Sequence, residues 1–310
     1  MVHMSEFTFL SSDERSRVCC RQYLPEGEAK AVVQIAHGIA EHIGRYDGFA
    51  RFLAEHGYIV VGNDHLGHGR TAGSGSLGSF GENHGWELAV EDMHRLHDLT
   101  AARFPGKPYF LFGHSMGSFL SRTYIIRYRS GLDGVILSGT GHQNTLTVNG
   151  GKLLSRLESR RHGSAFPSRE LNDLAFGKYT DRIPAPRTKS DWLTRDEAAV
   201  DAYEADPLCG FVPSAGLFRD MMGGIFFVTR SKNINRMSKD LPVYFLSGDC
   251  DPVGDYGKGV IRAYKSFLRA GMTDVTMKLY HGGRHEMLNE INSDEVFHDI
   301  LAWLDAKVGK

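Results

Sequence analysis

The sequence of 310 residues has few cysteines, no long hydrophobic run and no excess of charge of either sign. Its four cysteines, Cys19, Cys20, Cys209 and Cys250, match neither a zinc-ligand spacing nor a disulfide framework, so we expect small buried thiols in a reducing compartment. No window approaches the roughly 20 apolar residues of a membrane-spanning helix, and the first residues lack the pattern of a secretory signal. These absences favour a cytoplasmic protein.

The charges are balanced, with 36 Lys and Arg against 37 Asp and Glu and a formal net charge of −1. A protein that binds the phosphate backbone of nucleic acid usually carries a strongly basic face, and the composition gives no sign of one. We therefore expect no nucleic-acid partner.

Short apolar runs alternate with longer segments of helical period, which predicts an α/β fold with a largely parallel sheet covered on both faces. The expected parallel strands lie within residues 30–38, 57–64, 107–115, 133–139, 241–249 and 275–283. Residues 6–12 and 16–24 alternate like an antiparallel hairpin. Each parallel run ends in polar or glycine-rich residues, and ligands bind beyond the carboxyl ends of strands in such sheets.

Two of the intervening segments carry apolar stripes that we interpret as core-facing sides of helices. The first stripe consists of Phe49, Phe52, Leu53 and His56. The second consists of Trp86, Ala89, Val90, Met93, Leu96 and Thr100.

Residues 141–230 interrupt this alternation, because they contain no clear strand and are too many for a loop. We interpret them as a helical cap inserted between two parts of the core, residues 1–140 and 231–310. The apolar part of the cap, residues 211–228, would line a channel for an apolar ligand or form the core of the cap; we favour the channel.

The cap also carries a basic cluster, Arg156, Arg160 and Arg161. These side chains would either face water, which we favour, or attract anionic head groups.

The motif Gly113-His114-Ser115-Met116-Gly117 follows an apolar strand and precedes a helical segment. That context indicates a G-x-S-x-G nucleophile turn, in which Ser115 projects into a site. The start of the following helix would favour a developing oxyanion through its N–H groups and dipole. An N-capping serine in a glycine-rich turn is the weaker alternative.

A serine nucleophile needs a base, and the base needs an orienting acid, in the chain order Ser, acid, His. His281 and His285 follow the last expected strand; we assign His285, on a glycine-flexed loop, as the base and His281 as structural. The preceding strand opens into Asp249, Asp251 and Asp255, which could bind a cation, cap a turn or orient a histidine.

Taken together, the motifs resemble those of the monoacylglycerol lipase and lysophospholipase group of α/β-hydrolases, also classed with serine aminopeptidase-like hydrolases. They are VQIAHGIAEHIGRYDGFARFLAEHGY, GNDHLGHGRTAG, GHSMGS, EADPLCG, SGDCDPVG and HGGRHEMLNE. The resemblance implies that Asp251 is the acid, the last position of a G-x-x-D turn. Pro252 favours the same residue, since it biases Asp251 toward an extended conformation, while Asp249 suits an Asx-type turn.

The resemblance also implies an oxyanion hole formed by the backbone N–H groups of Ile39 and Met116, with His37 bracing the first of these loops. Glu41 and Arg45 match positions that line the polar end of the family's site, although an ordinary ion pair explains them equally well. Leu288 stands where these lipases commonly carry a second histidine, which is a departure from the pattern.

Histidine spacings suggest a metal only weakly. Asp64, His65 and His68, and His94 with His97, could hold zinc in the right fold, but no third-ligand cluster is evident. We expect neither a metal nor another cofactor.

The function expected from these features is hydrolysis of a lipid-like carboxylic ester, a monoacylglycerol or lysophospholipid, by Ser115, His285 and Asp251 through an acyl-enzyme. A general carboxylesterase or an aminopeptidase-like hydrolase is the alternative, and a non-catalytic binding protein is less favoured. We expect a small-molecule lipid ester as partner and transient membrane contact through the cap.

Overall fold

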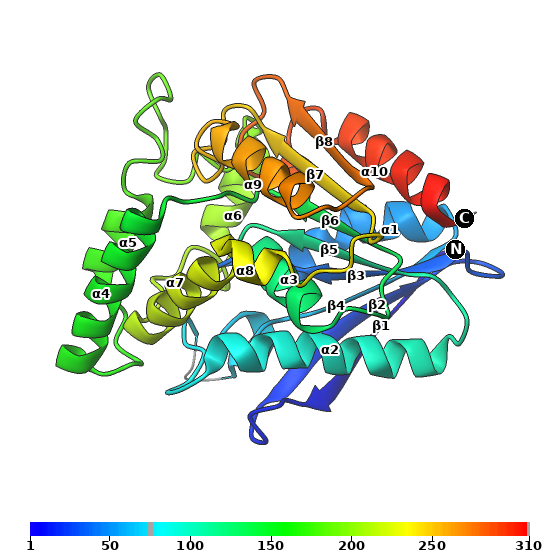
Figure 1. Ribbon diagram of the computed structural model, residues 1–310, viewed down its shortest axis with the longest axis horizontal. Helices are drawn as coiled ribbons and strands as arrows, with labels where there is room; N and C mark the ends of the chain where they lie inside the picture. Colours follow the sequence, from blue (N-terminus) through cyan, green and yellow to red (C-terminus); the bar gives the residue numbers. More distant parts are fainter. Residues whose placement is uncertain (74–76, 309–310) are drawn as a thin grey trace.

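The protein is described by a computed structural model that covers residues 1–73 and 77–308. Within these residues the strands form one eight-stranded sheet in the order β1-β2-β4-β3-β5-β6-β7-β8 (Figure 1). The strands are β1 (His3–Leu10), β2 (Arg17–Leu24), β3 (Ala31–Ala36), β4 (Tyr58–Asn63), β5 (Tyr109–His114), β6 (Gly134–Ser138), β7 (Val243–Gly248) and β8 (Val275–Tyr280). All the predicted strands are confirmed.

The sheet is parallel from β4 to β8, while β1 and β2 form the predicted antiparallel hairpin at its edge. Every residue of the inner strands β3 to β7 is buried, because helices cover both faces. The edge strand β1 instead alternates between exposed and half-buried positions.

Core helices cover the two faces and pack against alternate residues of the strands. On one face lie α2 (Gly85–Arg103), α3 (Met116–Arg127) and α9 (Lys258–Arg269), whose side chains share a cluster with Leu111 of β5. On the other lie α1 (Asp47–Glu55) and α10 (Ser293–Val308), which pack against Phe110 and Phe112. The period of two along β5 thus divides the core between two layers.

The segment between β6 and β7 consists of helices joined by loops. Two of these helices, α4 and α5, project away from the sheet in Figure 1. The helices of the segment are α4 (Thr145–His162), α5 (Arg169–Phe176), α6 (Glu197–Ala205), α7 (Ala215–Thr229) and α8 (Ser231–Ile234). Three short 3-10 helices lie elsewhere, η1 (Ile43–Tyr46), η2 (Gly69–Ala72) and η3 (Met287–Asn289). Among the described residues, no helix is both long and apolar enough to cross a membrane.

Two predictions about burial are corrected by the structure. His56 is exposed because it follows the last residue of α1, where its ring Nδ1 lies 2.7 Å from the carbonyl oxygen of Phe52. Cys250 is also exposed, since it lies in the turn after β7, and Cys19 is half-buried. The buried face of α1 therefore ends at Ala54, Phe52 is half-buried, and only Cys20 and Cys209 are buried thiols. The second predicted stripe, on α2, is buried throughout.

Candidate active site

Ser115 occupies the turn between β5 and α3 with a backbone φ of 51° and ψ of −119°. A positive φ is costly for a residue with a β-carbon, and such strain is typical of functional turns. The flanking glycines make the turn sterically feasible: a β-carbon on Gly117 would lie 2.0 Å from the carbonyl oxygen of Ala36, and one on Gly113 would lie 2.3 Å from Ser121 Oγ. The sequence motif therefore corresponds to a strained turn packed tightly against β3.

His285 lies on the loop after β8, and its Nδ1 is 3.0 Å from Asp251 Oδ2 on the loop after β7. Both side chains are almost completely buried. Asp251 also accepts hydrogen bonds from Val253 N, at 2.8 Å, and Ser247 Oγ, at 3.1 Å. The other ring nitrogen, His285 Nε2, is buried and has no hydrogen-bond partner among the described residues, so it is available to accept a proton.

The electrostatics of this pair favour a charged acid and a basic histidine. Burial opposes ionisation of Asp251, but the facing His285 and the hydrogen bonds outweigh it and lower the pKa of the carboxyl. Burial likewise disfavours a protonated His285, yet the neighbouring Asp251 outweighs it and raises the pKa of the imidazole. The pair is therefore suited to stabilise an imidazolium ion.

Asp249, which the sequence suggested as a turn residue, contacts the turn that follows β8. It accepts a hydrogen bond from Gly282 N at 2.7 Å, and its second oxygen is 3.0 Å from Nδ1 of the exposed His281. Each aspartate thus contacts one of the two candidate histidines, and only the Asp251–His285 pair is buried.

The loop after β3 passes directly beside the nucleophile. A β-carbon on Gly38 would lie 3.1 Å from Ser115 Cβ and 2.6 Å from Glu41 Oε1, so a larger residue would have to displace one of these side chains. Among the described residues, neither the backbone N–H of Ile39 nor that of Met116 donates a hydrogen bond. Two unused donors thus lie on the segments that adjoin Ser115.

His37 supports the loop after β3 through two contacts of its ring with backbone atoms. Its Nδ1 is 2.7 Å from the carbonyl oxygen of Gly38, and its Nε2 accepts a hydrogen bond from His65 N at 3.0 Å. Complete burial lowers the pKa of His37 to about 3, so the ring is neutral at physiological pH. With both nitrogens engaged in backbone contacts, His37 acts as a structural residue.

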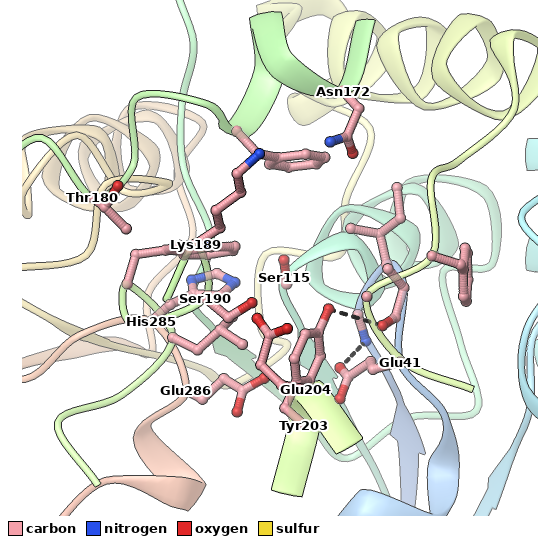
Figure 2. A pocket seen from close by; sticks show the side chains of 18 of the residues that line it. Glu41, Ser115, Asn172, Thr180, Lys189, Ser190, Tyr203, Glu204, His285 and Glu286 are labelled. Atoms are coloured by element: carbon pink, nitrogen blue, oxygen red, sulfur yellow. Dashed lines mark hydrogen bonds between the residues drawn. The ribbon is translucent and has the colours of Figure 1, made fainter. Parts of the chain in front are cut away.

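Ser115 and His285 line the same cavity, which has a volume of about 690 Å³ (Figure 2). Residues 38–41, His114 and Glu286 also line it, and the remaining lining residues come from the segment between β6 and β7. The apolar lining comprises Ile39, Phe176, Trp192, Leu193, Tyr203 and Phe211. The ring of Trp192 packs on His285 with centroids 5.0 Å apart, a contact that the sequence did not suggest.

The prediction that residues 211–228 line a channel for the ligand is largely wrong. Of this segment, only Phe211 lines the cavity. The apolar face of α7 instead packs into the core against α3, with Phe218, Met221 and Ile225 buried. The alternative, a core of the cap itself, is also incomplete, because the buried side chains of this helix belong to the same cluster as those of α2, α3 and the sheet.

Comparisons with known proteins identify the family of this chain. The family model described as serine aminopeptidase, S33 matches residues 27–292. The chain belongs to the serine aminopeptidase S33 family. Human monoglyceride lipase is 30% identical over 299 residues, covering 93% of this chain and 87% of that protein. The monoacylglycerol lipase of Mycolicibacterium smegmatis is 29% identical, covering 93% and 92%.

Solved structures agree with the family assignment. A thermostable carboxyl esterase from Bacillus coagulans, in complex with glycerol, superposes with a TM-score of 0.92 at 29% identity, covering 98% of this chain and 99% of that one. Monoglyceride lipase from Saccharomyces cerevisiae, at 21% identity and a TM-score of 0.76, shares the fold. This S33 hydrolase has the predicted α/β-hydrolase fold and is a carboxylic ester hydrolase.

A buried ionic network adjoins the cavity of this S33 hydrolase. Arg45 donates two hydrogen bonds to Glu286, from Nη1 at 2.5 Å and from Nη2 at 2.7 Å, and a third to Glu41 at 2.8 Å. Burial opposes ionisation of Glu286, but the facing Arg45 outweighs it and lowers the pKa of Glu286 to about 2. Glu41 also accepts bonds from Gly38 N and Tyr46 Oη, which ties the network to the loop beside Ser115.

Glu286 is a site residue that the sequence reasoning missed. Of the two predicted polar contacts, Glu41 lines the cavity directly, whereas the guanidinium of Arg45 is occupied by two carboxylates and packs 4.8 Å from the Tyr203 ring centroid. Leu288 lies behind this network, where it lines a small cavity of about 80 Å³ with Arg45 and Glu286.

The histidines singled out by spacing do not form one site. Asp64 accepts backbone hydrogen bonds from Ile43 and Arg70. His65 and His68 lie around the ring of His37. Ring packing therefore positions these two histidines, while both ring nitrogens of His65 and Nε2 of His68 are buried and have no hydrogen-bond partner among the described residues.

Among the described residues, two groups bring possible ligand atoms within 4.8 Å of one another. One contains the predicted pair His94 and His97 with Asp98, a third possible ligand that the sequence analysis did not identify. The other contains His42, Asp206 and Cys209, which the spacing did not suggest. Within each group a histidine nitrogen already contacts a carboxylate oxygen, at 2.9 Å in the first and 3.0 Å in the second. Hydrogen bonding accounts for both arrangements.

Proposed function

We propose that this hydrolase cleaves carboxylic esters by a two-step acyl transfer with Ser115 as nucleophile, His285 as base and Asp251 as the orienting acid. The proposal rests chiefly on one observation: His285 is held at Nδ1 by a buried carboxylate and has a free Nε2 in a cavity that it shares with Ser115. An imidazole arranged in this way can take the serine proton and later return it.

In the first step, His285 removes the proton of Ser115 Oγ as the oxygen attacks the ester carbonyl. The N–H groups of Ile39 and Met116 stabilise the oxyanion, and the start of α3 adds its dipole. His285 then gives the proton to the departing alcohol. Water, activated by the same nitrogen, attacks the acyl-enzyme and releases the acid and Ser115. No cofactor takes part.

We assign the substrate as a monoacylglycerol or lysophospholipid. The names of the relatives support the first, and the cavity, whose lining combines aromatic and aliphatic side chains with charged ones, suits an acyl chain joined to a polar alcohol. Arg45 is neutralised by Glu41 and Glu286 and has little capacity to bind a phosphate, but Lys178 and Lys189 line the same cavity and could do so, and both substrates therefore belong to the proposal.

Residues 141–230 act in this proposal as a cap that covers the site. Their helix α4 presents Leu146, Leu153 and Leu157 to solvent, with exposed fractions of 85%, 59% and 52%. Exposed leucines beside exposed arginines suit transient contact with an anionic membrane surface. Flotation with vesicles of phosphatidylserine and phosphatidylcholine tests this: wild type should float, and L153Q/L157Q should remain in the dense fraction.

An aminopeptidase-like activity is the second candidate. Glu204 lines the same cavity and is exposed (Figure 2), and a carboxylate there would suit the α-amino group of a peptide. A peptide substrate would place that amine near Glu204 instead of an alcohol near Glu41.

A fluorophosphonate probe tests the nucleophile: wild type should be labelled and Ser115→Ala should not. If wild type were unlabelled, the serine hydrolase mechanism would be wrong and a binding role would be favoured. Monoacylglycerols of graded chain length, lysophospholipids and amino-acid anilides then test the substrate class. Faster turnover of the anilides would replace the lipase proposal by the aminopeptidase one.

A further inference from the structure

A second cavity, of about 630 Å³, lies outside the proposed active site and shares no lining residue with it. Its walls come from the start of α2, the end of α3 and the helices α4, α7 and α8. α4 and α7 lie side by side at the edge of this region (Figure 1). Two half-buried aromatic side chains, Phe226 and Phe227, provide apolar wall area.

The cavity is strongly basic, although the whole chain has a net charge of −1. Its lining contains the cationic residues Arg127, Lys152, Arg156, Arg219, Arg230 and Lys232, against the two carboxylates of Glu87 and Asp220. The lining thus has a surplus of four positive charges. A cavity with one sign of charge and apolar walls concentrates ligands of the opposite sign.

Internal ion pairs neutralise only part of this charge. Asp220 is 2.7 Å from Arg219 Nε, and Glu87 is 3.8 Å from Arg127. Within residues 1–73 and 77–308, the remaining four cations, Lys152, Arg156, Arg230 and Lys232, have no carboxylate partner.

Two of these unpaired cations converge on a single ring. Lys152 Nζ, from α4, is 4.3 Å from the centroid of Phe226, and the guanidinium carbon of Arg230, which follows α7, is 5.1 Å from it. Cation–π contacts of this kind fix the positions of side chains that would otherwise be mobile. Burial, together with the neighbouring Arg156, lowers the pKa of Lys152, so a bound anion would relieve an existing repulsion.

We propose that this cavity binds an organic phosphate, with the phosphate between Lys152, Arg156 and Arg230 and an aromatic or apolar portion against Phe226 and Phe227. A phosphate carries more charge and more acceptor oxygens than one carboxylate, and guanidinium groups bind it through paired N–H donors. The site is independent of ester hydrolysis at Ser115.

Isothermal titration calorimetry of the full chain tests the proposal with three probes: ATP, inorganic pyrophosphate and adenosine. ATP should bind saturably with one site per chain. Pyrophosphate should bind more weakly because it lacks the ring, and adenosine should not bind measurably because it lacks the charge. The affinity for ATP should fall as salt is raised.

The variant K152E/R230E should weaken ATP binding by about tenfold or more, because it removes two charge-assisted contacts. R160E/R161E is the matched control: it changes the net charge equally, on exposed residues of α4 that do not line the cavity, and should bind ATP like wild type. Both variants should keep wild-type thermal unfolding and wild-type hydrolysis of a soluble p-nitrophenyl ester, which needs no membrane contact. If K152E/R230E unfolds, K152Q/R230Q serves instead, with R160Q/R161Q as its control.

Absence of saturable ATP binding to wild type would overturn the proposal. Equal weakening in the two variants would overturn it as well, since the effect would then come from net charge. Pyrophosphate binding as tightly as ATP would overturn the assignment of an aromatic or apolar portion.

Discussion

The role of Asp251 can be tested by its replacement with asparagine, because the structure fixes how the new amide must lie. Asp251 Oδ1 accepts the backbone N–H of Val253, whereas Oδ2 faces His285 Nδ1 and Ser247 Oγ. In Asp251→Asn the amide oxygen must keep the Val253 bond, so the NH₂ group faces His285. The imidazole would then accept at Nδ1 and carry its proton on Nε2, where it can no longer take the proton of Ser115.

From this loss of the correct tautomer we expect kcat/KM to fall roughly 10⁴-fold, equivalent to about 5 kcal/mol of transition-state stabilisation. Hydrolysis of a p-nitrophenyl ester at neutral pH measures it. Asp249→Asn is the matched control, since Asp249 bonds the partly exposed turn at Gly282 and the exposed His281; it should keep wild-type turnover and lose about 1 kcal/mol of unfolding free energy. A greater loss of turnover in the Asp249 variant than in the Asp251 variant would refute the assignment.

Three further predictions concern the same site. Because the pKa of His285 is raised above its ordinary value and only the neutral ring acts as a base, the acid limb of kcat/KM should have its midpoint above about pH 6.5; a lower midpoint in a pH–rate profile would contradict this. Glu286→Gln leaves the buried guanidinium of Arg45 with Glu41 as its only full counter-charge, so chemical denaturation should show a loss of about 2 kcal/mol, and unchanged stability would argue against the ion pair. Gly117→Ala should yield little folded, active enzyme because its β-carbon would overlap the backbone of β3, and normal activity would show that the turn can open.

The sequence was informative where a structural feature is local. The inner strands are buried on both faces, so they read as continuous apolar runs. The turn at Ser115 is defined by glycines two residues away on either side, because both approach other backbone or side-chain atoms closely. The choice between Asp249 and Asp251 was also local, resting on Pro252 as well as on the family resemblance.

Contacts between segments that are far apart in the sequence could not be predicted from a local sequence pattern. Arg45 and Glu286 are 241 residues apart, and nothing near Glu286 marks it as buried. The contact of Trp192 with His285 comes from a segment without regular periodicity. The stripe on α7 could be predicted as apolar, but its period did not reveal whether it faced a ligand or the core.

Hydrogen bonds between the cap and the catalytic loops have a consequence for domain exchange. The carbonyl oxygen of Ala40 accepts bonds from Tyr203 Oη and Gly210 N, and the backbone N–H of Glu286 donates to the carbonyl oxygen of Leu193. A chimera that replaced all of residues 141–230 would therefore remove supports of the loops beside Ser115 and His285. Exchange of substrate preference between relatives should succeed when only the outer helices α4 and α5 are grafted and residues 190–210 remain with their own core.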